Sequence, residues 1–586
     1  MSWFEANLAP IMFGSLIVFL LTGFPVAFSL AACGMFFGFI GVELGMLPVS
    51  LLQALSLRLV GIMQNETLLA IPFFTFMGLI LERSGMAEDL LETVGQVFGA
   101  VRGGVVIAVI LVGAMLAATT GVVAASVISM GLISLPIMLR YGYNREIAAG
   151  AITASGTLAQ IIPPSLVLIV LADQLGRSVG DMYAGAFLPG FMLVGVYCLF
   201  IAVIAIVKPS WVPALPLEAR IYREPNGASG SRSLTVLAVV SIAIGVVFGK
   251  FYPEIIGWLK GAEPQAQPTD ETIVMALAAG VLSAWLLAAI SRMLRLNLFS
   301  RIAERVTFVL IPPLALIFLV LGTIFLGVAT PTEGGAMGAV GALIMAVSRG
   351  KLDFNLTKQA LNSTAKLSSF VIFVLVGSTV FSLTFQGIDG PIWVEHLFDK
   401  LPGGQFGFLF VVNALIFVLG AFLDFFEIAF ILIPLLVPVA EKLDVDLIWF
   451  GVMIAMNLQT SFLTPPFGFA LFYLRSVAPA ADYADKVTKK VVARVTTGQI
   501  YRGSVPFVIL QLVMLAVIWT WPGIVTNAID GGKKIDASDI KIELPSDGED
   551  QKDENEEDEK PFGAGYGTSE GKSDAAPAAS DGEKKN

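Results

Sequence analysis

The chain has 586 residues, of which 56% are hydrophobic and 14% are charged, and its formal net charge at pH 7 is -10. Several apolar runs reach the roughly 20 residues that a helix needs to cross a bilayer, which excludes a soluble globular protein and predicts an all-α polytopic membrane protein. Segment 530–586 alone holds 17 acidic and 8 Lys residues, so the remaining chain is nearly neutral. We therefore expect the lipid bilayer, and no nucleic acid, as a partner.

The sequence lacks several motifs that would indicate an enzyme. No G-x-x-x-x-G-K-[ST] or H-E-x-x-H pattern occurs, so we expect neither ATP hydrolysis nor another enzymatic activity on this chain. The two cysteines, Cys33 and Cys198, lie in apolar segments, and His396 is the single histidine. A disulfide framework and a Cys/His metal centre are therefore excluded.

Segment 1–209 begins with short membrane spans. Its first apolar block, Leu8 to Val42, is divided near Pro25, which predicts two spans joined there. The stretch 47–61 has the spacing of an amphipathic helix, so we expect it to lie along the membrane interface. Another span is predicted from Ile62 to Leu81.

Two interruptions of apolar sequence follow in the same segment. The run 103–139 is interrupted at Thr119, Thr120 and Gly121, which predicts a re-entrant hairpin. The run 146–172 is interrupted twice, first at Ser155, Gly156 and Thr157 and then at Pro163 and Pro164, which predicts a discontinuous helix before a further span at 186–207. Main-chain groups left bare in lipid cost several kcal/mol, so such breaks persist where protein, water or an ion satisfies them.

The rest of the chain repeats this plan after a connector. The connector, 210–305, carries two extra candidate spans at about 234–248 and 272–290. Segment 306–529 then contains a second hairpin at about 406–440, with its tip near Leu423 and Asp424, and a second discontinuous helix at about 447–475. The acidic segment 530–586 is too polar to bury a core, so we expect it to be disordered.

Short motifs recur in the same order in 1–209 and 306–529, which we name copy 1 and copy 2. Pro25 matches Pro331 at an offset of 306 residues, while IIPPS (161–165) matches LTPPF (463–467) at an offset of 302. The preserved order predicts a duplication. If each hairpin turns back, copy 1 crosses five times and the connector twice. An odd total inverts copy 2, which is the inverted-repeat plan of secondary transporters.

Lys and Arg gather in alternate loops, and such loops face the cytoplasm. Under this rule both termini are predicted to lie outside, with 261–271, 388–404 and 441–447. The predicted cytoplasmic segments are 83–102, 140–145, 210–233, 292–305, 349–366 and 486–494.

The breaks are rich in hydroxyl groups, amides and glycines, which suit Na⁺, a hard cation that prefers oxygen ligands. A half-helix C-terminus adds partial negative charge to such a site. For any single Ser, Thr or Gly, close packing is the alternative reading. The candidate Na⁺ ligands are Thr119, Thr120, Gly121, Ser155, Gly156, Thr157, Asp424, Gln459, Thr460 and Thr464.

An anionic substrate would be bound at half-helix N-termini, whose free amides attract carboxylates. We expect such half-helices to begin at Pro164 and Pro466. Asp424 and Glu427 lie three residues apart beside the second hairpin tip, and a carboxylate at membrane depth indicates function unless it reaches solvent at the outer mouth. The candidate substrate residues are Thr157, Gln160, Pro164, Asp424, Glu427, Asn457, Gln459, Thr460 and Pro466.

Five segments together resemble the large membrane subunit of the tripartite ATP-independent periplasmic (TRAP) transporters, the DctM-like family. The segments are LLAIPFFTFMGLILERSGM (68–86), the TTG hairpin (119–121), GTLAQIIPPS (156–165), ATPTEGGAMG (329–338) and LQTSFLTPPFGF (458–469). Two features depart from the usual plan of that family, namely the extra pair of spans in the connector and the acidic tail. The second hairpin tip, LDFFE, also differs from the hydroxyl-rich tips of many relatives.

The resemblance implies an elevator-type transporter that imports an organic carboxylate with Na⁺ as the coupling ion. It further implies a small DctQ-like membrane subunit, a DctP-like periplasmic binding protein that delivers the substrate, and residence in a bacterial inner membrane, where the charge rule makes both termini periplasmic. Two alternatives stay open, a stand-alone ion-coupled organic-anion carrier and a channel or membrane enzyme. The missing catalytic motifs disfavour an enzyme, and paired broken helices disfavour a channel.

Overall fold

The computed structural model describes residues 3–222, 224, 230–260, 269–296, 298–325, 327–485 and 487–527. In this part of the chain most residues are helical, and the sheet is a two-stranded antiparallel pair, β1 (Tyr483–Ala484) and β2 (Val491–Val492). Eight of the described helices are long and apolar enough to cross a membrane, or up to ten if each bent helix pair is one span. The predicted all-α polytopic membrane protein is confirmed. The acidic tail 530–586 lies outside the described residues.

Copy 1 begins with six helices, and one of them differs from our expectation. The predicted interfacial helix, α4, continues into α5 with a bend of only 46° and packs along α16 (Phe354–Gly387), so the two helices form a bent rod. A helix lying in the membrane plane would stand nearly perpendicular to the span that follows it. The bounds are α1 (Trp3–Ala6), α2 (Leu8–Leu21), α3 (Val26–Glu43), α4 (Val49–Met63), α5 (Glu66–Arg83) and α6 (Met86–Phe98).

The first hairpin and the first discontinuous helix follow. α11 (Val179–Val207) begins earlier than the predicted Ala186, because the Ser178 side chain caps it and accepts a hydrogen bond from the Asp181 N–H at 3.3 Å. The bounds before it are α7 (Gly104–Thr120), α8 (Val123–Arg140), α9 (Arg145–Thr157), the 3-10 turn η1 (Leu158–Gln160) and α10 (Leu166–Gln174), and η2 (Leu217–Ala219) lies after it.

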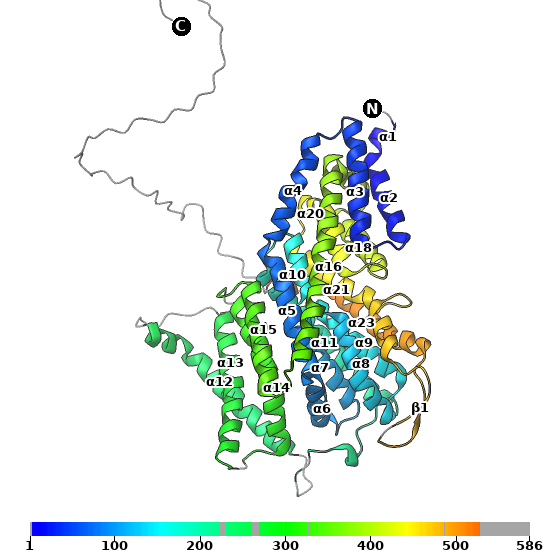
Figure 1. The fold of residues 1–586 in the computed structure, drawn as a ribbon. Helices are drawn as coiled ribbons and strands as arrows, with labels where there is room; N and C mark the ends of the chain where they lie inside the picture. The colour runs from blue at the N-terminus through cyan, green and yellow to red at the C-terminus, as the bar shows by residue number, and fades with distance from the viewer. Residues whose placement is uncertain are drawn as a thin grey trace, which may run out of the picture. The chain divides into compact units, whose positions relative to one another are not determined.

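Both connector helices are longer than predicted. α12 continues beyond Phe248 through Lys250 and Glu254, because Lys and Glu favour helical backbone once the apolar stretch has ended. α12 and α13 pack together closely, and an added Cβ on Gly245 would lie 2.6 Å from the Ala276 carbonyl oxygen. Figure 1 shows this pair beside α14. The bounds are α12 (Ser231–Lys260), α13 (Thr269–Met293), α14 (Arg301–Phe325) and α15 (Pro331–Ser348).

Copy 2 continues after α16 with the second hairpin and the second discontinuous helix. The hairpin consists of α18 and the pair α19 and α20, and the discontinuous helix consists of α21 and α22. The bounds are α17 (Gly390–Asp399), α18 (Gly404–Leu419), α19 (Phe425–Ile431), α20 (Ile433–Lys442), α21 (Leu447–Leu463), α22 (Phe469–Val477), α23 (Thr497–Thr520) and α24 (Gly523–Thr526).

The two copies exchange their second half-helices. α10 of copy 1 packs against α19 and α21 of copy 2, while α22 of copy 2 packs against α8 and α9 of copy 1. The exchange buries Leu166 to Ala172 almost completely. Each discontinuous helix is thus completed by the other copy, as in folds whose inverted repeats meet near the membrane midplane.

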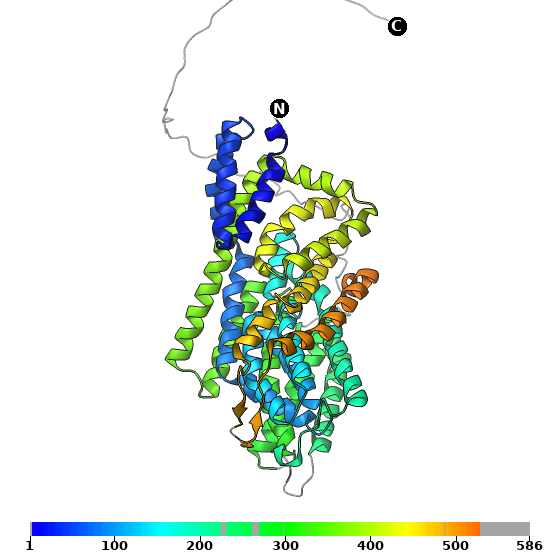
Figure 2. The same cartoon turned by 90° about the vertical axis from the view of Figure 1, so that its right-hand side faces the viewer.

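The helices form two sets by their contacts. The core helices are α7 to α11 and α18 to α24, in which α9 packs on α23 and α18 packs on α21. The outer helices are α2 to α6 and α12 to α16, in which α15 packs on α5, α16 on α3, and α14 on α15. Figures 1 and 2 show these sets from two sides.

Charged side chains near helix ends form two separate groups of ion pairs. Asp89 binds both Arg305, at 2.9 Å, and Arg349, at 2.6 Å. Lys442 binds Glu395 and also Asp399, at 3.2 Å. The first group joins segments that the charge rule assigns to the inside, and the second joins segments that it assigns to the outside. Which side is cytoplasmic stays a prediction.

An ion pair attaches the β1–β2 loop to the end of α8. The Nε atom of Arg140 lies 3.0 Å from Oδ1 of Asp485, whose side chain is buried. The Thr488 N–H donates to the same carboxylate at 2.6 Å, and this bond together with Arg140 lowers the pKa of Asp485 from 3.8 to about 2. The attachment therefore holds at neutral pH and weakens only as the pH falls from 3.8 toward 2. Figure 2 shows the sheet at the same end as the start of α14.

Two glycines allow α9 and α23 to cross in backbone contact. A Cβ added at Gly150 would overlap the main chain of Gly503, and a Cβ added at Gly503 would overlap the carbonyl of Glu146. The end of α9 is therefore held at a fixed place beside α23.

We expect Gly503→Ala to lower the free energy of unfolding by about 1–3 kcal/mol, because the added methyl group pushes α23 away from α9. Thermal unfolding of the purified protein in detergent measures this loss. The matched control is Gly195→Ala on α11, where an added Cβ meets no atom within 4 Å. Equal melting temperatures of the two variants would contradict the proposed close contact.

Candidate functional site

The first hairpin turns where the sequence is interrupted. α7 ends at Thr120, and Gly121 adopts a φ of 60°, a conformation that favours glycine, with its N–H donating to the Ala117 carbonyl at 3.1 Å. A Cβ at Gly121 would lie 2.9 Å from the Leu166 side chain. The turn therefore contacts the start of α10, the second half of the discontinuous helix.

The discontinuous helix of copy 1 is interrupted over residues 158–165. After η1, the Pro163–Pro164 peptide is cis, and Ser165 Oγ donates to the Gln160 carbonyl at 3.0 Å. We expected the second half-helix to begin at Pro164. It begins at Leu166 instead, because Ser165 is extended and closes the turn with its side chain before the helix starts.

The second break is built in a similar way. The Pro465–Pro466 peptide is cis, and the Gly468 N–H donates to the Thr464 carbonyl at 2.9 Å. This turn occupies the residues that follow α21, so α22 begins at Phe469 and not at the expected Pro466. The ring of Phe467 lies 4.8 Å, centroid to centroid, from that of Phe422 in the second hairpin tip.

The two breaks differ in exposure. In copy 1 the residues from Ser155 to Leu171 are buried throughout. In copy 2 the tip residue Phe422 is 56% exposed, and Phe467 of the break is 47% exposed. In this conformation the second break is therefore accessible from the protein surface, whereas the first break is enclosed.

The candidate Na⁺ ligands of copy 1 do not form one cluster. Three consecutive helix positions point in directions about 100° apart, because a helix has 3.6 residues per turn. Ser155 accordingly lies against Gly113 of α7, Gly156 against Val127 of α8, and Thr157 against Gln511 of α23. Gly121 lies at the hairpin turn, and the side chain of Thr120 is not among those described.

The hydroxyl groups at the breaks share one arrangement, since each donates its proton to a carbonyl of its own helix. The lone pairs of these oxygens then remain as acceptors for a cation or a donor group, and one on Thr157 already faces Gln511. The bonds are Thr119 to Leu116 (2.9 Å), Ser155 to Ile152 (3.0 Å), Thr157 to Ala154 (2.9 Å), Thr460 to Met456 (2.9 Å) and Thr464 to Thr460 (2.8 Å).

Three predicted amide residues carry polar atoms without a protein partner. Among the described residues, both side-chain polar atoms of Gln160 and of Gln459 are buried without a hydrogen bond of good geometry, and so is Oδ1 of Asn457, although the Gln459 side chain lies near the Tyr197 hydroxyl. Buried polar groups in proteins are nearly always hydrogen bonded, so these atoms require water, an ion or a substrate. The donor set of amide oxygens and hydroxyls fits a hard cation, and the amide N–H groups fit an anion.

Two buried residues of the site were missed from the sequence. Gln511 of α23 donates through Nε2 to the Tyr197 hydroxyl at 2.7 Å and to Thr157 Oγ1 at 3.5 Å, and its Oε1 has no partner. The available signal was a single glutamine within an apolar span, where a polar side chain needs a partner. Tyr197 gave no such signal.

Asp424 and Glu427 have a structural role in the second hairpin. Asp424 is the N-cap of α19, and its side chain accepts from the Phe425 N–H at 2.8 Å and from the Glu427 N–H, while Glu427 accepts from the Asp424 N–H at 3.0 Å. This is a reciprocal capping box. Such bonds occupy part of each carboxylate, and the remaining oxygen atoms leave room for a further ligand.

Comparison with known proteins identifies the family of this chain. Residues 13–524 match the family described as the tripartite ATP-independent periplasmic transporter, DctM component. This chain belongs to that family. The DctM family is a family of transporter permeases and not of enzymes, which confirms both the predicted family and the expected lack of enzymatic activity.

The chain is similar to several curated DctM-type permeases. It is 26% identical over 474 residues to the C4-dicarboxylate TRAP transporter large permease protein DctM of Pseudomonas aeruginosa, covering 80% of this chain and 88% of that protein. It is 24% identical over 486 residues to the isethionate TRAP transporter permease protein DctMQ of Oleidesulfovibrio alaskensis, covering 83% and 63%. It is 23% identical over 513 residues to the sialic acid TRAP transporter permease protein SiaT of Haemophilus influenzae, covering 87% and 66%.

Among solved structures, the crystal structure of the Alcanivorax borkumensis YdaH transporter is similar, with a TM-score of 0.44 and 14% sequence identity over 80% of this chain and 89% of that chain.

The two roles of Asp424 are separable by substitution, because asparagine caps a helix about as well as aspartate. We expect Asp424→Asn to keep the stability of the DctM permease and to reduce transport. We expect Asp424→Ala to lower the free energy of unfolding by about 0.5–2 kcal/mol as well. Thermal unfolding and uptake are measured on both variants. Wild-type uptake by Asp424→Asn would show that the residue only caps α19.

Proposed function

We propose that this TRAP large permease imports an organic carboxylate with Na⁺, in a bacterial inner membrane with both termini periplasmic. The substrate is delivered by a DctP-like periplasmic binding protein, and a small DctQ-like subunit completes the complex. The observation that carries the proposal is the set of unpaired buried polar atoms at both breaks, on Gln160, Asn457 and Gln459. A cation and an anion together satisfy these acceptors and donors.

The names of the relatives support an anionic substrate. They are named for C4-dicarboxylate, isethionate and sialic acid, and all three are organic acids. The exposed second break supplies the free amides at the start of α22, while hydroxyl and amide oxygens supply the cation ligands. We assign substrate binding to Gln160, Gln459 and Thr460 and to the turn after Thr464, and cation binding to Thr157.

The two sets of helices support an elevator mechanism. Both hairpins and both discontinuous helices belong to the core helices, which exchange their half-helices and pack on one another. The outer helices pack mainly among themselves. In the proposed cycle the core helices move as one body against the outer helices and carry ion and substrate across the membrane. The two groups of ion pairs support the predicted sidedness.

Uptake into proteoliposomes tests the coupling directly. With the small subunit, the binding protein and a panel of C4-dicarboxylates, sialic acid and isethionate, we expect accumulation of one class of acid only under an inward Na⁺ gradient. An equal K⁺ gradient is the control. Uptake that is unchanged without Na⁺ refutes Na⁺ coupling, and Na⁺-driven uptake without the binding protein favours the stand-alone carrier.

Thr157→Ala tests the cation site at the end of α9. We expect the Na⁺ concentration for half-maximal uptake to rise about tenfold, the effect of losing roughly 1.4 kcal/mol of binding, with little change in melting temperature. Thr153→Ala is the matched control, because Thr153 is equally buried, makes the same bond to its own helix and lies one turn earlier. If both variants show the same Na⁺ titration, Thr157 is not a ligand.

A further inference from the structure

A long apolar cavity of about 450 Å³, which we name the slot, separates α14 from α6, α7 and α11. On α14 its wall is one stripe of side chains, Val306, Leu310, Leu314, Ile317 and Leu321. This stripe spans roughly 22 Å at about 1.5 Å per residue. The slot therefore follows α14 for most of the thickness of a bilayer core.

The opposite wall combines side chains of α6, which is an outer helix, with side chains of the core helices α7 and α11. It includes Ala114 and Ala118 of α7 and reaches Ile162 and Pro163 of the first break. The slot thus lies on the boundary between the outer helices and the part of the core that contains the predicted site.

The chemistry of the slot favours a hydrocarbon chain over water as its occupant. All of its lining residues are aliphatic, aromatic, Met or Pro, so water finds no hydrogen-bond partner there. A cavity of about 450 Å³ spread along this stripe is narrow compared with a helix and its side chains, which is about 10–12 Å across. A single hydrocarbon chain in van der Waals contact with the walls fits such a narrow cavity.

The slot opens toward the lipid side of the protein. Phe187 and Phe191 of α11 line it and are 41% and 49% exposed, with ring centroids 4.7 Å apart. The alanines on the α7 wall are buried. A lipid acyl chain from the surrounding bilayer can therefore enter the slot past the rings of Phe187 and Phe191.

Cationic side chains stand at the end where α14 begins. Ser300 donates through its N–H to Ser233 Oγ at 3.0 Å and through Oγ to the Gly230 carbonyl at 2.9 Å, which holds the starts of α12 and α14 together. Arg232 and Arg301 flank this joint and are exposed. Guanidinium groups bind phosphate oxygens in a bidentate manner.

We propose that the slot binds one acyl chain of a glycerophospholipid, with the lipid phosphate held by Arg232 and Arg301. The lipid fills the gap between α14 and the core helices, where leaving it empty would forfeit the contacts of a whole apolar wall. This proposal does not depend on the substrate or on the coupling ion.

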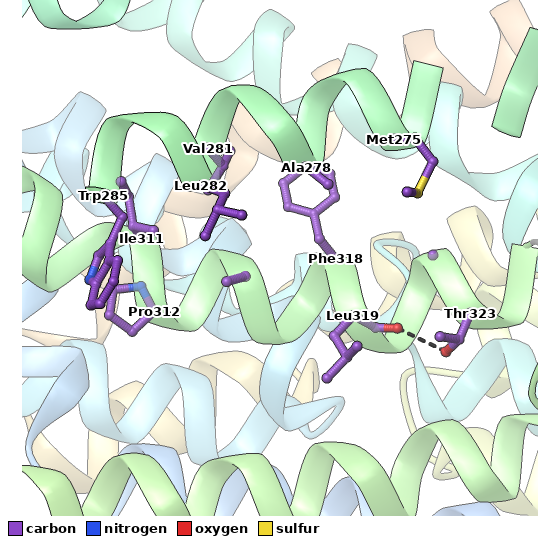
Figure 3. A pocket seen from close by; sticks show the side chains of 12 residues that line it. Met275, Ala278, Val281, Leu282, Trp285, Ile311, Pro312, Phe318, Leu319 and Thr323 are labelled. Carbon is purple, nitrogen blue, oxygen red and sulfur yellow. Dashed lines mark hydrogen bonds between the residues drawn. The ribbon is translucent and has the colours of Figure 1, made fainter. Parts of the chain in front are cut away.

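A second apolar pocket, of about 470 Å³, lies on another side of α14 and shows why the slot is distinctive. Figure 3 shows Met275, Leu282 and Trp285 of α13 facing α14 across it. Leu282 is 56% exposed and Leu319 is 49% exposed, so this pocket is an open groove.

Native mass spectrometry of the full-length protein, purified in mild detergent and incubated with phosphatidylglycerol, tests the proposal. We expect the wild type to retain one phospholipid more than Leu314→Trp, in which the larger side chain fills the slot. The matched control is Leu199→Trp on α11, where Leu199 is 65% exposed and outside the slot. We expect Arg232→Gln combined with Arg301→Gln to retain the lipid at least threefold less.

Thermal unfolding and gel filtration show whether each variant is folded. If Leu314→Trp does not fold, Ala114→Leu fills the slot with a smaller change. Equal lipid retention by a folded slot variant and by the control overturns the proposal. It is also overturned if the mass retained by the wild type is that of detergent and not of phospholipid.

Discussion

The architecture depends on one constraint, namely that main-chain polar groups freed by a helix break inside a membrane need partners. At the first break Ser165 satisfies the Gln160 carbonyl, and at the second the Gly468 N–H closes a turn on Thr464. At the second hairpin Asp424 and Glu427 cap the chain where it re-enters a helix. The local sequence therefore satisfies part of the freed backbone, whereas the side chains of Gln160 and Gln459 are left for something that the described residues do not supply.

The close contacts of the core follow from the same requirement. Side chains can satisfy a break only when neighbouring helices are near, and the glycines at positions 150 and 503 bring α9 and α23 into main-chain contact. That approach places Gln511 within reach of Thr157 and Tyr197. The outer helices contact this packed core less extensively than the core helices contact one another. At α14 the slot lies along much of the boundary between the two sets. A closely packed core and an apolar boundary would allow the proposed motion of the core helices against the outer helices.

The sequence located the breaks but not the directions of their side chains. Interruptions of apolar runs at Gly121 and at the two proline pairs are one-dimensional signals, so the helix ends there were predictable within a few residues. The divergence of Ser155, Gly156 and Thr157 onto three neighbouring helices depends on packing that no local pattern contains. The three-residue spacing of Asp424 and Glu427 is ambiguous. Two ligands on one helix face have this spacing, and so do the two residues of a capping box. Tyr197 was missed because its role depends on a partner more than three hundred residues away.

The exchange of half-helices bears on how the chain is assembled during synthesis. The faces of α8 and α9 that receive α22 stay uncovered until Phe469–Val477 has emerged and inserted. Copy 1 thus enters the membrane with part of its packing surface uncovered. It reaches its final packing only after nearly the whole chain has been translated. A premature stop before α22 would leave a protein whose early helices are all present yet whose centre is never closed.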